Sequence, residues 1–231
     1  MYRIACVQME PKLGEIEGKR RESARLISEA ASQGAKLIVL PEAAAAGYGG
    51  LGLGPFGYVP LDLPVVSEAL TARGLYIVAG TIFDDLVAPA RRADLLRQTR
   101  EICALITGLP KPPGAGGQRY PAPYLTVMDW GHDERDFAAG HSARAPRLSA
   151  EAWDGMMATI RAIAEVARDE SGVRAVVHPH AGGYIEFRDE IDRLAADIPA
   201  DVAGFCIDTG HSHSAGTVSY THLTLPTTYP V

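Results

Sequence analysis

The sequence is poor in the features that mark secreted, membrane-spanning or nucleic-acid-binding proteins. It has only three cysteines, Cys6, Cys103 and Cys206, which lie far apart in apolar runs and predict buried free thiols rather than disulfides. No apolar run approaches the ~20 residues of a membrane span. The N-terminus has an apolar strand where a signal peptide needs a basic region and a cleavage site. These absences predict a soluble, cytoplasmic protein.

Basic residues are also in short supply. The net charge is −6, and lysine and arginine form no cluster, which argues against nucleic acid or an anionic membrane as a partner. The sequence indicates no particular oligomeric state.

The apolar content, in contrast, is ample. With 231 residues and 47% apolar side chains, the chain can bury the core of one α/β domain. Strand-like runs alternate with helical patterns, which favours a parallel sheet with outer helices. One long helix is expected over 149–169, with Ser149 as its N-cap and an apolar stripe for the core. The seven strand candidates are residues 2–9, 36–40, 51–53, 74–80, 124–129, 174–178 and 203–208.

Ionisable residues gather where the last two predicted strands end. The carboxyl ends of parallel strands meet at one edge of a sheet, so these side chains are expected to share a site. They are His178, His180, Glu186, Asp208 and His211. The long loop 131–148, at the end of another strand, is a candidate lid or substrate loop. Its His132 and His141 are expected to be exposed to solvent.

The first 42 residues carry their own signature. The stretch RIACVQMEPKLGEIEGKRRESARLISEAASQGAKLIVLPE resembles the amino-terminal βαβ unit of the nitrilase (carbon–nitrogen hydrolase) superfamily. The resemblance places Glu42 at that family's general-base position. That family also needs a lysine and a nucleophilic cysteine, and neither Cys103 nor Cys206 occupies a strand-to-helix elbow. Glu42 therefore also reads as a strand-end carboxylate without a catalytic role.

Residues 43–216 resemble a different family. The motifs AAAAGYGGLGLGPFGYVPLD, GLYIVAG, YLTVMD, HPHAGGYIEFRDEIDRL and CIDTGH are similar to those of sugar phosphate isomerases and epimerases. These are xylose isomerase-like TIM barrels, and the inosose dehydratase-like branch is the most similar. The resemblance implies an α/β fold, as a partial (β/α)8 barrel that is truncated after the sixth strand and preceded by the nitrilase-like βαβ.

The same resemblance implies roles for the strand-end residues. Asp208 and His178 would bind a divalent metal (Mn, Mg, Co or Zn), with His178 standing where many relatives have glutamate. His178 and Glu186 would act as catalytic acid/base groups, and His180 and His211 would bind a sugar or polyol substrate. For each residue a role as N-cap, loop anchor or core hydrogen-bonding group is the alternative, and the incomplete ligand set leaves open a chain that binds no metal.

The last residues fit neither family. The stretch VSYTHLTLPTTYPV resembles the translation of a sequencing adapter, so we expect three parts: a nitrilase-like fragment (1–42), a barrel fragment (43–217) and a non-native tail (218–231). Three functions follow from this organisation. The first is a metal-dependent isomerase, epimerase or dehydratase, expected to be inactive in this chain. The alternatives are a nitrilase-type amidase and a non-catalytic chimeric fragment.

Overall fold

The computed structural model describes residues 50–57, 59–72, 74–111 and 120–216, which form the main body. It also describes the two short strands 3–6 and 35–39 and the single residues 25, 28, 29 and 32. Strands β1 (Arg3–Cys6) and β2 (Ala35–Val39) pair in parallel in a sheet of their own. This pairing agrees with the parallel βαβ strands expected at the start of the chain.

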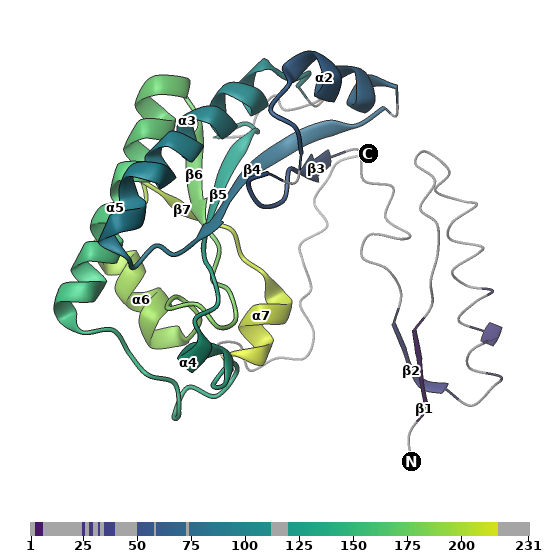
Figure 1. Ribbon diagram of the computed structural model, residues 1–231. Coiled ribbons are helices and arrows are strands. Elements are labelled where there is room, and N and C mark those ends of the chain that lie inside the picture. The colour runs from purple at the N-terminus through teal and green to yellow at the C-terminus, as the bar shows by residue number, and fades with distance from the viewer. Residues whose placement is uncertain are drawn as a thin grey trace.

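The main body is built on a five-stranded parallel sheet in which each strand pairs with its neighbour in sequence (Figure 1). This order is that of a (β/α)8 barrel wall, and it confirms the predicted parallel α/β fold. In order, the strands are β3 (Gly50–Gly52), β4 (Tyr76–Asp84), β5 (Tyr124–Asp129), β6 (Arg174–Val177) and β7 (Gly204–Phe205).

One strand was predicted to end too early. Strand β4 was expected to end at Gly80, but it continues to Asp84, because residues 79–84 pair one to one with β5 up to Asp129. The extension carries the chain to the same edge of the sheet at which β5 ends. Loops 85–88 and 130–132 therefore start side by side.

Helices cover one face of this sheet. Helices α3 and α5 lie against it, while α4 and α7 lie near the carboxyl ends of the strands (Figure 1). None of the helices in the described ranges combines the length and apolar character needed to cross a membrane. The helices are α2 (Leu63–Thr71), α3 (Arg92–Gly108, after the 3-10 turn Pro89–Arg91), α4 (Asp133–Asp136), α5 (Ala150–Ser171), α6 (Arg188–Asp197) and α7 (Thr209–Ser214).

Helix α5 confirms the long helix predicted from the sequence. The Ser149 side chain accepts a hydrogen bond from the Ala152 backbone N–H at 3.1 Å, which caps the amino end. Gly172 ends the helix with φ of 66°, in the left-handed region that glycine adopts at low cost. The apolar stripe between these caps, including Trp153 and Met156, is buried.

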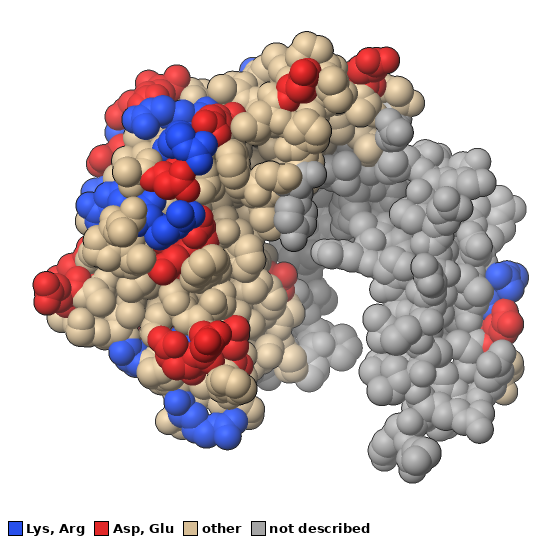
Figure 2. Space-filling view, in the orientation of Figure 1, with Lys and Arg blue, Asp and Glu red and all other residues tan. Residues whose placement is uncertain are grey.

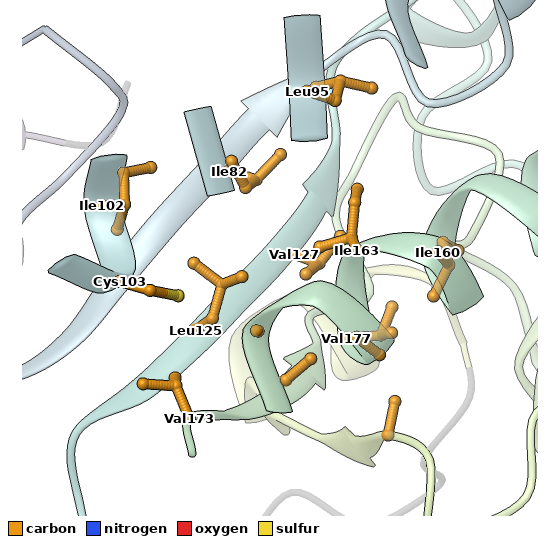
Figure 3. Close-up of a cluster of buried hydrophobic side chains, with 14 of the residues drawn as sticks. Ile82, Leu95, Ile102, Cys103, Leu125, Val127, Ile160, Ile163, Val173 and Val177 are labelled. Atoms are coloured by element: carbon orange, nitrogen blue, oxygen red, sulfur yellow. The ribbon is translucent and has the colours of Figure 1, made fainter. Parts of the chain in front are cut away.

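The core lies between the sheet and helices α3 and α5 (Figure 3). Along β5 the side chains alternate, so that Leu125 and Val127 point into this core while their neighbours are half-buried. Gly80 allows α3 to approach the sheet closely, because a Cβ atom there would lie 2.2 Å from the Ile102 side chain. Acidic and basic side chains lie next to one another along the left side of the described body in the space-filling view (Figure 2).

We predict that Leu125→Ala lowers the free energy of unfolding by about 2 to 5 kcal/mol, because the side chain is fully buried and would leave a cavity. Ile207→Ala serves as the control: Ile207 is 75% exposed, so the change should stay within about 0.5 kcal/mol. Urea unfolding followed by circular dichroism measures both. Equal effects of the two substitutions would contradict this description of the core.

Candidate active site

The sheet continues its hydrogen bonding for one residue beyond β6 and β7. The backbone N–H of His178 donates to the Val127 carbonyl at 2.9 Å, and that of Cys206 donates to the Val177 carbonyl at 2.8 Å. His178 and Cys206 therefore keep the register of the sheet although the regular strands have ended. This register places the first histidine of the site beside the Cys206 backbone.

The protonation of the His178 ring follows from its neighbours. Its Nδ1 lies 3.1 Å from the Cys206 carbonyl oxygen, which can only accept, so Nδ1 carries the proton and Nε2 is the basic nitrogen. Nε2 in turn lies 3.2 Å from Nδ1 of His211. Burial is the main reason that the pKa of His178 lies below its ordinary value, with the nearby His211 adding to the effect.

His211 is brought to this position by helix α7, which sequence analysis did not predict. Asp208 is the N-cap of the helix, and its Oδ1 accepts from the His211 backbone N–H at 2.8 Å. This backbone hydrogen bond is the main cause of the lowered pKa of Asp208. Ligand atoms of His178, Asp208 and His211 all lie within 4.8 Å of one another. The structure thus brings together three residues singled out from the sequence.

His180 adds a third imidazole to this group. Its ring centroid lies 4.7 Å from that of His211 and 5.9 Å from that of His178. Nδ1 of His180 lies 2.8 Å from the Ala181 carbonyl oxygen, so Nε2 is again the basic nitrogen. Burial is the main cause of the lowered pKa of His180. The three rings therefore present basic nitrogens at one end of the sheet.

Glu186, expected as an acid/base group, is buried and engaged in holding loops. Its two carboxylate oxygens accept from the backbone N–H groups of Gly140, at 2.7 Å, and Gly182, at 3.0 Å. One oxygen also lies 3.7 Å from the Arg135 guanidinium. These contacts tie the β5–α5 connection to the β6–α6 loop. The catalytic role of Glu186 stays a prediction, and its contacts favour the loop-anchoring alternative.

Arg135, on α4, is the centre of this loop network, and its side chain is fully buried. It pairs with both oxygens of Glu190, at 2.9 and 3.0 Å. It also donates to the carbonyl oxygens of Gly183, at 2.9 Å, and Pro146, at 2.8 Å. Glu190 in turn accepts from the backbone N–H of Phe187 at the start of α6. One ion pair therefore links α4, the loop before α5, and the loop between His178 and α6.

We predict that Arg135→Met destabilises the protein by about 3 to 5 kcal/mol, because it removes the fully buried cation that pairs with both oxygens of Glu190 and leaves only the partly exposed Arg147, whose Nε lies 3.3 Å from that carboxylate. Arg188→Met is the matched control: it breaks the Arg188–Asp192 pair, in which both side chains are largely exposed, and should change stability little. Denaturant unfolding measures both.

The double variant Arg135→Met/Glu190→Leu separates charge burial from packing. It should recover part of the lost stability, because neither charge is then buried alone. A double variant that is as unstable as the sum of the two single changes would contradict the ion-pair explanation.

A second polar group, which sequence analysis did not assemble, lies where β4 and β5 end. Asp129 is buried, and its carboxylate accepts from the backbone N–H groups of Leu86, at 3.1 Å, and Tyr184, at 2.8 Å. It also lies 3.0 Å from Nε2 of His132. The His132 side chain is only 14% exposed, so the expectation that it faces solvent was wrong, whereas His141 is exposed as expected. The sequence signal that could have revealed this group is the alternating strand 124–129, which ends at Asp129.

This contact favours the charged form of His132. Burial lowers the pKa of His132, but the hydrogen bond and the charge of Asp129 outweigh burial and raise it above the ordinary value. A raised pKa in the folded state stabilises the fold below the unfolded pKa of about 6.5. The stabilisation is lost as the pH rises through the folded value.

We therefore predict that His132→Gln destabilises the protein more at about pH 5.5 than at about pH 8.5. Comparison of the variant with the parent at each pH removes the contribution of other titrating groups. His141→Gln, at an exposed position of the same loop, should show no such difference. A loss that is equal at the two pH values would show that Asp129 does not hold a charged His132.

Comparison with known proteins identifies the family. A family model described as a xylose isomerase-like TIM barrel matches residues 40–226. The protein therefore belongs to the xylose isomerase-like TIM barrel family. The match extends into segment 218–231, which lies outside the described residues, so its assignment as a non-native tail stays a prediction.

Two individual proteins are also similar to parts of the chain. A nitrilase from Pyrococcus abyssi (strain GE5 / Orsay) is 33% identical over 91 residues, which are 37% of this chain and 35% of that protein. The chain thus spans about a third of that relative. The crystal structure of the probable 3-DHS dehydratase AsbF, involved in petrobactin synthesis, from Bacillus anthracis superposes with a TM-score of 0.48 at 10% identity. That superposition covers 94% of this chain and 66% of the other. Glu42, the nitrilase-like candidate, lies outside the described residues.

Proposed function

We propose that this chain carries the centre of a metal-dependent enzyme that moves a proton next to a carbonyl of a sugar or polyol, as in isomerases, epimerases and dehydratases. The observation that carries the proposal is the orientation of His178. Its Nδ1–H is held by the Cys206 carbonyl, while its Nε2 faces His211. Histidines that bind metals are usually held in this way by a backbone carbonyl or carboxylate at the second nitrogen.

The separations within the group suit a single ion. Two imidazole nitrogens bound to a tetrahedral ion at about 2.0–2.1 Å lie about 3.3 Å apart. The facing nitrogens of His178 and His211 are 3.2 Å apart, and Asp208 completes a set within 4.8 Å. Asp208 offers a carboxylate whose lowered pKa keeps it ionised near neutral pH.

A divalent ion bound there would polarise a substrate carbonyl or hydroxyl group. For His211 to bind through Nδ1, its proton must move to Nε2, which then becomes a donor toward a substrate oxygen. His180 keeps its proton on Nδ1 through the Ala181 carbonyl, so its Nε2 can accept a hydrogen bond or proton from substrate. These assignments name the atoms of this chain that would carry out the proposed reaction.

The nitrilase-type amidase is the second candidate, because the identity with the Pyrococcus nitrilase favours it. Amide hydrolysis of that type needs a reactive thiolate, which requires a lowered cysteine pKa. Among the described residues, burial raises the pKa of Cys103 to about 12 and also raises that of Cys206. Neither thiol has the environment of a nucleophile, so the metal-dependent reaction is the better supported function.

We predict that Asp208→Asn lowers the affinity for Mn²⁺ or Co²⁺ by at least about tenfold. Asparagine keeps the N-cap hydrogen bond that orients α7, so the loss reports the missing charge rather than a misplaced His211. Calorimetric titration of the full chain measures it. Asp192→Asn, at an exposed position of α6, is the control and should bind like the parent.

Turnover is tested separately by incubating the metal-loaded chain with a keto-polyol in D₂O and following loss of the proton next to the carbonyl by NMR. Exchange that requires both the ion and Asp208 would support the proposed enzyme. Metal binding without exchange would favour the alternative of a non-catalytic chimeric fragment.

A further inference from the structure

A hollow lies on the face of the sheet opposite α3 and α5. Leu125, Val127 and Val177 point into the core between the sheet and those helices (Figure 3), so the residues that alternate with them along β5 and β6 point the other way. The hollow has a volume of about 480 Å³, which is the size of a pocket for a small organic molecule. Its walls include Tyr120, Tyr124, Arg174, Val176, Gly204 and Cys206.

A single charged group stands among the aromatic and apolar groups of these walls. Arg174 is half-buried and is the one charged residue among the described residues that line the hollow. Its guanidinium lies over the Tyr120 ring, 3.9 Å from the ring centroid, and donates a hydrogen bond to the Ala200 carbonyl oxygen. Within the described part of the chain, no carboxylate forms an ion pair with Arg174. The hollow therefore offers a cation that has N–H donors but no anionic partner there.

The absence of a side chain at Gly204 makes room for this guanidinium. A Cβ atom at residue 204 would lie 3.2 Å from Nη2 and 3.4 Å from Nε of Arg174, which is closer than most such contacts. Tyr124 is the register partner of Arg174 on the neighbouring strand, so their side chains leave the sheet side by side on the same face. The cation and a tyrosine ring are thus held next to each other by the sheet itself.

We propose that the hollow binds a planar aromatic carboxylate, with the carboxylate on Arg174 and the ring against Tyr124 and Tyr120. The guanidinium presents its N–H donors in a rigid fork that matches the two oxygens of a carboxylate. Tyrosine rings favour a flat aromatic partner in offset or edge-on contact. One cation matches one negative charge, and apolar walls disfavour a ligand with many hydroxyl groups. This ligand class differs from the sugar or polyol of the proposed function.

The test is calorimetric titration of the full chain, in the presence of a chelator, with 2-naphthoate and with its uncharged counterpart 2-naphthamide. We expect 2-naphthoate to bind at least about tenfold more tightly, because only the carboxylate forms a charge-assisted pair with Arg174. Arg174→Gln should remove this preference. Arg174→Lys keeps the charge but loses the fork, so it should retain part of the preference. Arg188→Gln, at an exposed position of α6, is the matched control and should bind both compounds like the parent.

The position of the ligand is tested separately through Cys206, which borders the hollow and is half-buried. Bound 2-naphthoate should slow the alkylation of Cys206 by iodoacetamide severalfold, as followed by mass spectrometry of its peptide. Cys103 is fully buried in the core on the other face of the sheet, so its slow alkylation should not change. Binding that leaves the alkylation of Cys206 unchanged would overturn the proposed location.

The remaining outcomes decide the role of Arg174. Equal affinities of the parent for 2-naphthoate and 2-naphthamide, or a preference that persists in Arg174→Gln, would overturn the pairing of the carboxylate with this residue. If Arg174→Gln does not fold, a preference in Arg174→Lys as large as that of the parent would overturn the pairing through the fork. A folded parent that binds neither compound would overturn the whole proposal. None of these measurements depends on a bound metal ion, so the proposed function stands or falls independently of them.

Discussion

A buried cation, Arg135, holds in place the segments on which the candidate site is built. Its guanidinium pairs with Glu190, and it donates to carbonyl oxygens of two loops, at Gly183 and Pro146. A buried ion pair is costly to form but more costly to break, because removing one partner leaves a bare charge in the interior. These contacts join α4, the loop before α5 and the loop that carries His180, whereas the sheet register places His178.

The sheet provides the second constraint. Each strand of the main body pairs with its neighbour in sequence, so the ends of β6 and β7 lie next to each other. Backbone bonding past the last regular residues brings the Cys206 carbonyl to the His178 ring. Cys206 thus bonds to the sheet through its backbone N–H and to the candidate metal centre through its carbonyl oxygen.

Carboxylates at this edge divide into two kinds by their partners. Asp129 and Glu186 are buried and accept from backbone N–H groups of neighbouring loops, and Asp129 also forms a group with Asp85 and His132 whose ligand atoms lie within 4.8 Å of one another. Asp208 uses Oδ1 for its helix cap and lies within ligand distance of two imidazoles. Its lowered pKa arises mainly from the backbone donor. Carboxylates at the same edge of one sheet therefore differ in how many backbone N–H groups they bind.

The sequence by itself determined the parallel α/β pattern, the long helix with its Ser149 cap, and the placement of His178 and Asp208 in the segments that follow neighbouring strands. These features depend on alternation and capping, which involve residues close together in the chain. Only the tertiary structure decided that Glu186 anchors loops, that His132 is covered and paired with Asp129, and that α7 turns His211 toward His178. Each of these outcomes depends on a partner from a distant segment, whose position is set by packing and by the need to satisfy buried charges.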